Sequence, residues 1–83
     1  MTPNPAQVVL VAGEAATTAR LFAGLQRHLT QVSLDRRDER TIVIRATSAS
    51  PLLYQAVTDT LYRIDPAWRL HAVLHEESNL DDR

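Results

Sequence analysis

The sequence predicts an α+β domain in which two helices cover one face of a four-stranded antiparallel sheet. Three patterns lead to this prediction. Residues 31–47 alternate apolar and polar side chains on both sides of a charged run, as a β-hairpin does. A segment with apolar residues at helical spacing stands on each side of the hairpin. A strand-like segment precedes the first helix and another follows the second, so the predicted order is β-α-β-β-α-β.

The register of the hairpin follows from its apolar residues. Pairing Leu34 with Ile44 and Val32 with Ala46 places both apolar sets on one face of the sheet. This pairing requires a loop with an odd number of residues. Because the segment between the two strands contains no Gly or Asn to supply a positive φ, we expect the wide loop, residues 37–41.

The first strand and the first helix are expected at residues 6–12 and 14–29. The strand is a continuous apolar run, which is typical of a central strand that is covered on both faces. Gly13 ends it. Within the helix, Gly24 costs about 1 kcal/mol relative to Ala, and we expect it to allow close packing against the sheet. The apolar face of this helix consists of Thr18, Leu21, Phe22, Leu25 and Leu29.

The second helix is expected to begin with Ser50 as N-cap and Pro51 as its first residue. It should end at Asp65, because a residue that precedes proline avoids the helical region. Its buried face consists of Leu53, Val57, Leu61 and Ile64. The last strand is expected at residues 68–76, with one face made of Trp68, Leu70, Ala72 and Leu74.

The chain has 83 residues, which suits one domain with one modest core. We expect that domain to span residues 6–76, between a disordered leader (1–5) and a flexible acidic tail (77–83). With right-handed crossovers, the strand order becomes 4-1-3-2 and both helices lie on one face, which is the ferredoxin-like arrangement. The alternative treats residues 32–34 as a loop and leaves a three-stranded βαβαβ layer.

Composition excludes several classes of function. The net charge is −1, and the nine basic residues, all arginine, form no basic cluster, so we expect no nucleic-acid partner. There is no cysteine for a disulfide, a thiolate metal site or a nucleophile. No apolar run approaches about 18 residues and no signal peptide is visible, so we expect no direct membrane insertion. The expected location is cytoplasmic, either as such or as the soluble domain of a larger or membrane-associated protein.

Neither a metal site nor a catalytic site is predicted. His71 and His75 are four residues apart, and on a strand this separation spans about 13 Å, too far for one metal ion. His28 has no recognisable partner in the sequence. The motifs of hydrolases, zinc proteases and phosphate-binding loops are absent, and there are two glycines in all. We therefore expect no enzyme activity, no catalytic residue and no cofactor.

The sheet face that the helices leave open is the predicted functional surface. Val43 and Val73 are expected at its centre, and Arg45, His71 and His75 at its rim. An apolar centre with a charged rim is typical of a protein interface. The sequence therefore favours a non-catalytic interaction module that forms a homodimer or binds a protein partner. The alternative interpretation is a sheet face with a few scattered exposed valines.

Two segments carry a family resemblance over residues 7–76. The segment VVLVAGEAATTARLFAGLQRHL, the hairpin and the segment AVTDTLYRIDPAWRLHAVLHE together resemble the ACT-type small-molecule regulatory domains. They also resemble ACT-like tail domains such as that of MgtC-type membrane proteins. The resemblance implies a regulatory or interaction module, paired through its sheets or helices.

The same resemblance implies an alternative function at the loop after the first strand. In ACT domains this loop usually carries an acid followed by Pro-Gly, and an amino-acid ligand binds there. This chain has the acid, Glu14, after Gly13, but lacks the Pro-Gly. The alternative is therefore a sensor of a small, amino-acid-type ligand, bound near Gly13 and Glu14.

Overall fold

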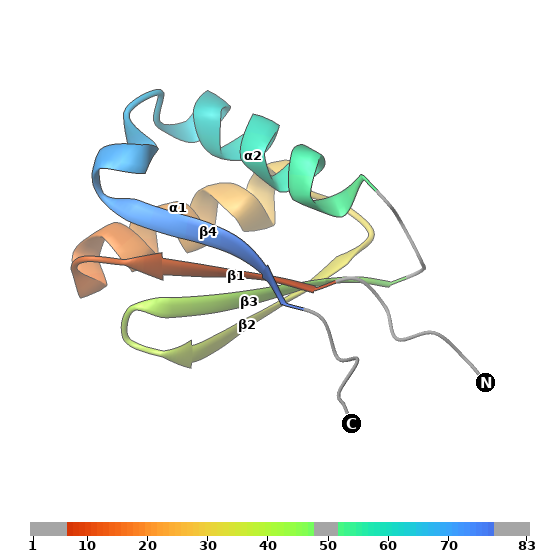
Figure 1. Cartoon of the computed structure of the whole chain (residues 1–83), viewed down its shortest axis with the longest axis horizontal. Helices are drawn as coiled ribbons and strands as arrows, with labels where there is room; N and C mark the ends of the chain where they lie inside the picture. Colours follow the sequence, from red (N-terminus) through yellow and green to blue (C-terminus); the bar gives the residue numbers. More distant parts are fainter. Residues whose placement is uncertain (1–6, 48–51, 78–83) are drawn as a thin grey trace.

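The computed structural model describes residues 7–47 and 52–77 of the chain, and they form an α+β domain (Figure 1). Four antiparallel strands form one open sheet, and two helices pack on it. The predicted helix start at Ser50 and Pro51, and the predicted leader and tail, lie outside the described residues apart from Glu77. The elements are β1 (Gln7–Ala12), α1 (Ala15–His28), β2 (Val32–Asp38), β3 (Thr41–Ala46), α2 (Leu53–Ile64), the 3₁₀ helix η1 (Trp68–Leu70) and β4 (Ala72–Glu77).

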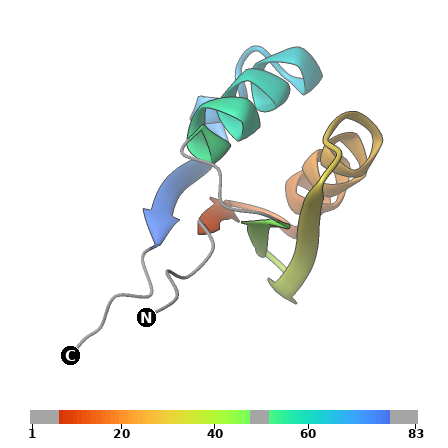
Figure 2. The ribbon, with the colours of Figure 1, turned by 90° about the vertical axis from the view of Figure 1, so that its right-hand side faces the viewer.

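The strand order is β2-β3-β1-β4, with β1 and β3 in the centre and β2 and β4 at the edges. The expected order, 4-1-3-2, names the same neighbouring pairs when it is read from the β4 edge. Seen along the sheet, both helices lie on the same side (Figure 2). The architecture is compatible with a ferredoxin-like fold, and the three-stranded alternative is excluded because β2 pairs with β3 over most of its length.

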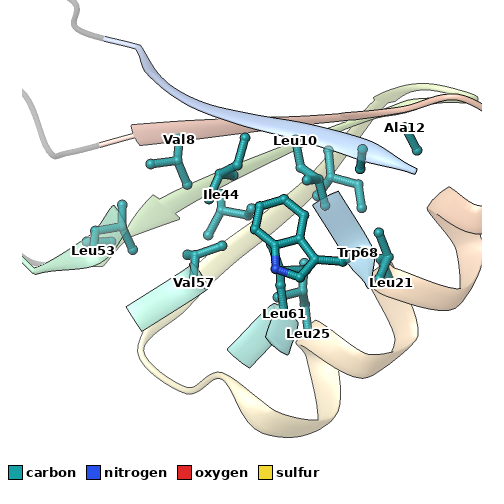
Figure 3. Close-up of a cluster of buried hydrophobic side chains, with 14 residues drawn as sticks. Val8, Leu10, Ala12, Leu21, Leu25, Ile44, Leu53, Val57, Leu61 and Trp68 are labelled. Atoms are coloured by element: carbon teal, nitrogen blue, oxygen red, sulfur yellow. The ribbon is translucent and has the colours of Figure 1, made fainter. Parts of the chain in front are cut away.

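The hydrophobic core fills the space between the helices and one face of the sheet. Every second residue of β1 and β3 belongs to it, which follows from the period of two in a strand. Trp68 is 1% exposed and lies between Leu10 on the sheet and the helix residues Leu25 and Leu61 (Figure 3). The core consists of Val8, Leu10, Ala12, Leu21, Leu25, Ile42, Ile44, Ala46, Leu53, Val57, Leu61, Trp68, Ala72 and Leu74.

Gly24 permits close contact between the two helices, not between a helix and the sheet as expected. A Cβ atom at this position would lie 2.6 Å from Cδ1 and 2.7 Å from Cγ1 of Ile64 on α2. Real Cβ atoms do not approach other carbons so closely, so the contact needs a residue without a side chain. The apolar spacing that defines the two helices was predicted correctly.

The hairpin has the predicted register but a different turn. Leu34 pairs with Ile44 and Val32 with Ala46, as expected. The wide loop over residues 37–41 is wrong: the strands continue to Asp38 and are joined by a two-residue turn. The odd residue needed for the register is taken up by a β-bulge between Arg36 and Asp38.

The side chain of Asp38 stabilises this turn. Its carboxylate accepts a hydrogen bond from the main-chain N–H of Arg40 at 2.9 Å, and this bond lowers the pKa of Asp38. The turn therefore closes through an Asp side chain rather than through a glycine.

The last strand begins later than predicted, because residues 68–70 form η1 instead of extended chain. The carboxylate of Asp65 accepts the N–H of Ala67 at 2.9 Å, and its main-chain carbonyl accepts the N–H of Trp68 at 3.0 Å. These bonds fold the chain into a turn. The first residue of β4, Ala72, pairs with Ala12, the last residue of β1. Residues before Ala72 therefore have no partner strand residue, and Leu70 is 82% exposed instead of facing the core.

Candidate functional site

The open face of the sheet carries the side chains that alternate with the core residues of each strand. Val9 and Val43 lie opposite each other in its middle row, flanked by Asp35 on β2 and His75 on β4. Both valines are only 2% exposed. Val43 was expected to be the exposed centre of the surface, and this expectation is wrong because its side chain is buried.

The exposed apolar surface lies further along the sheet, at the end of β1. Val11 on β1 and Val73 on β4 are directly opposite each other in the register and are 38% and 65% exposed. We refer to these two side chains as the valine pair. Val73 was predicted at this surface, whereas Val11 was not singled out. Leu70 lies at the same end of the sheet, where the Gly13 N–H donates to the His71 carbonyl at 2.9 Å.

Of the predicted rim residues, His75 lies next to the valine pair, whereas Arg45 lies at the opposite end of the sheet, paired with Gln7. Arg45 is exposed on β3 of the open face, and its Nε donates to Oε1 of Gln7 at 2.8 Å. His75 is exposed on β4, opposite Val9. His71 does not belong to this face as a strand residue, because it precedes β4 and ends η1.

A pocket lies beside the valine pair, at the point where β1 leads into α1. Its volume is about 490 Å³, and its lining residues are Gly13, Glu14, Thr17, Leu70 and His71. Gly13 and Glu14 are the predicted ligand-binding residues, and the structure brings His71 to them from a distant part of the sequence. Thr17 and Leu70 were missed. Thr17 stands three residues after Glu14, so helical spacing could have identified it, whereas Leu70 could be placed only once η1 was known.

The start of α1 gives this pocket its hydrogen-bonding character. Glu14 is the N-cap residue, with an extended backbone and no side-chain hydrogen bond to the helix. Its main-chain carbonyl accepts the N–H of Thr18 at 3.1 Å and the Thr18 hydroxyl at 3.0 Å. No side chain of the described residues caps the first N–H groups of α1, so these groups are donors for an anionic group. The Glu14 carboxylate, in the same pocket, suits a cationic group.

The described residues contain neither a metal-binding cluster nor a membrane-spanning helix. Within residues 7–47 and 52–77, no three side chains of His, Cys, Asp or Glu gather closely enough to hold a metal ion. None of the helices in the described part of the chain is long and apolar enough to cross a membrane.

The candidate site thus comprises the valine pair and the adjoining pocket, both at the end of β1. No protein-family model, no curated protein and no solved structure matches this chain.

Proposed function

We propose that this chain is a non-catalytic regulatory domain of ACT-like, ferredoxin-like type that associates with a second copy of itself through the open sheet face. The observation that carries the proposal is the exposed valine pair. Val73 is 65% exposed on the open face, while its chain neighbours Ala72 and Leu74 are buried on the other face of the sheet. Covering this apolar surface would release water and favour association.

The two edges of the sheet are less suited to association than its open face. At the β4 edge, the Tyr54 hydroxyl donates to the main-chain carbonyl of Leu74 at 3.3 Å, so a side chain from α2 already occupies this acceptor. At the other edge, β2 ends in a run of four charged residues, Asp35 to Asp38. Charged side chains on an edge strand oppose pairing with a further strand.

The charges on the open face favour a copy of the same chain as the partner. Asp35 on β2 and Arg45 on β3 are both exposed on this face. In a twofold-symmetric pair, each surface meets itself, so a face with both an acid and a base can place opposite charges against each other.

Sedimentation equilibrium over a series of protein concentrations tests this proposal. The wild-type chain should dimerise, and Val73→Asp should shift it to monomer because a carboxylate would be buried in the interface. Val73→Thr, which keeps the branched shape and replaces one methyl group by a hydroxyl, is the milder control and should weaken the dimer less. Val43→Asp is unsuitable as a test, because a buried carboxylate would unfold the domain. A dimer unaffected by Val73→Asp would refute the role of the open face.

The pocket beside the valine pair supports a second candidate function, the binding of a small amino-acid-type ligand. Uncapped N–H groups of α1 would bind its carboxylate, and Glu14 would bind its amino group. A thermal-shift screen of the free amino acids should identify at least one that raises the melting temperature, and Glu14→Gln should abolish the shift. If no amino acid raises the melting temperature, this second function is wrong.

A further inference from the structure

A second pocket lies between the two helices, away from the open face of the sheet. Its volume is about 350 Å³, and its lining residues are Ala23, Gly24, Arg27, His28, Arg63 and Ile64. The helices lie side by side here (Figure 2), and the missing side chain at Gly24 lets them approach each other.

Among the described residues, the charged and polar side chains that line this pocket are all basic. Arg27 and His28 come from the last turn of α1, and Arg63 comes from the last turn of α2. No acidic residue within 7–47 and 52–77 lines the pocket. Although the sequence shows no basic run, the packing of α1 against α2 at Gly24 and Ile64 brings these side chains to one pocket.

The three basic side chains have no partner in the described part of the chain. All three are exposed, and none makes an ion pair or a side-chain hydrogen bond there. By contrast, Arg20, earlier in α1, forms an ion pair with Asp65, just after α2, at 3.1 Å. The pocket is thus a place where cations from both helices gather without a counter-charge.

The helix dipole accounts for a cation at the end of each helix, but not for this arrangement. It favours a basic residue near each C-terminus separately. It does not explain why Arg27 and Arg63 line the same pocket, where two positive charges stand together. An anion in the pocket would balance these charges.

We propose that this pocket binds the phosphate group of a small molecule. Arg27 and Arg63 would donate charge-assisted hydrogen bonds to its oxygens, since guanidinium groups match phosphate in shape and charge. His28 would add an N–H donor. A nucleic acid is a poorer candidate, because no aromatic residue from the described part of the chain lines the pocket to stack on a base. This inference is independent of the proposed self-association.

Isothermal titration calorimetry with inorganic pyrophosphate as the probe tests the proposal. The wild-type chain should bind one equivalent saturably, and Arg27→Gln or Arg63→Gln should each weaken binding by about tenfold. Arg40→Gln, on the hairpin turn, removes the same charge at a distance from the pocket and is the matched control. It should change the affinity by less than about twofold.

Three results would overturn the proposal. The first is the absence of saturable pyrophosphate binding. The second is an equal loss of affinity in Arg40→Gln and Arg63→Gln, which would show that only net charge matters. The third is tighter binding of a short single-stranded oligonucleotide than of pyrophosphate, with loss in Arg63→Gln, which would assign the pocket to nucleic acid. Fluorescence of the buried Trp68 verifies that each variant is folded.

Discussion

The contact between Gly24 and Ile64 yields a prediction in which the sign of a stability change reverses. In a helix interior, Gly→Ala ordinarily stabilises by about 1 kcal/mol. Here the new methyl group would lie 2.6 Å from Cδ1, 2.7 Å from Cγ1 and 3.1 Å from Cγ2 of Ile64. Two of these atoms are attached directly to Cβ, and a β-branched side chain in a helix has essentially one rotamer, so Ile64 cannot simply turn away.

The net effect follows from two opposing contributions. Displacing Ile64 should cost about 1–3 kcal/mol, as overpacking does in other cores. Subtracting the gain in helix propensity leaves Gly24→Ala destabilised by about 0–2 kcal/mol. In an Ile64→Ala background all three contacting atoms are gone, so the same substitution should stabilise by about 1 kcal/mol.

Urea unfolding monitored by the fluorescence of Trp68 measures these free energies. This residue is the single tryptophan of the chain and is 1% exposed, so its emission should change strongly on unfolding. The four chains of the double-mutant cycle differ at positions 24 and 64 alone. If Gly24→Ala stabilised the domain equally in both backgrounds, the close helix contact would not exist and the reasoning would be refuted.

Two further predictions concern the loop before β2 and the turn after α2. Gln31 has a φ of 61°, and its carbonyl accepts hydrogen bonds from both the N–H and the hydroxyl of Thr47. Because glycine adopts a positive φ without strain, Gln31→Gly should raise the urea midpoint by relieving strain of up to about 1 kcal/mol. A lower midpoint would contradict this. The pKa of Asp65 is lowered by the hydrogen bond from the Ala67 N–H and by Arg20. The charged Asp65 carboxylate therefore stabilises the domain at pH values above its ordinary pKa of 3.8, and this stabilisation is lost as the pH falls through the lowered pKa of the folded state. Asp65→Asn should therefore destabilise the domain at about pH 7 and have a smaller effect at about pH 3, as measured by urea midpoints, and an effect independent of pH would refute the role of the charge.

The sequence allowed the element order and the hairpin register to be predicted, because both depend on the period of apolar residues. Leu34 and Ile44 can face the core together in one register only. The turn could not be predicted, since a bulge at Arg37 and a wide loop both supply the odd residue. The 3₁₀ helix that begins at Trp68 was not predicted, because the alternation of apolar and polar residues in β4 continues back through it. Only the end of β1 at Ala12 shows where pairing between β1 and β4 stops.

The candidate site was predicted less completely than the fold. Gly13, Glu14 and Val73 were identified, since a loop after a strand and the open face of a sheet can be located from topology. The burial of Val43 could not be predicted from alternation, because alternation shows which face of the sheet a side chain lies on but not whether other side chains cover it. The basic pocket between the helices could not be predicted from the sequence either, because Arg27 and Arg63 line one pocket only as a result of tertiary packing.

The most direct test of the central claim is the solution mass of the wild-type chain and of Val73→Asp, measured by sedimentation equilibrium at matched concentrations. The claim that the open sheet face mediates self-association predicts a dimer for the wild type and a folded monomer for the variant. A wild-type chain that remains monomeric at every concentration, or a variant that dimerises as strongly, would contradict it.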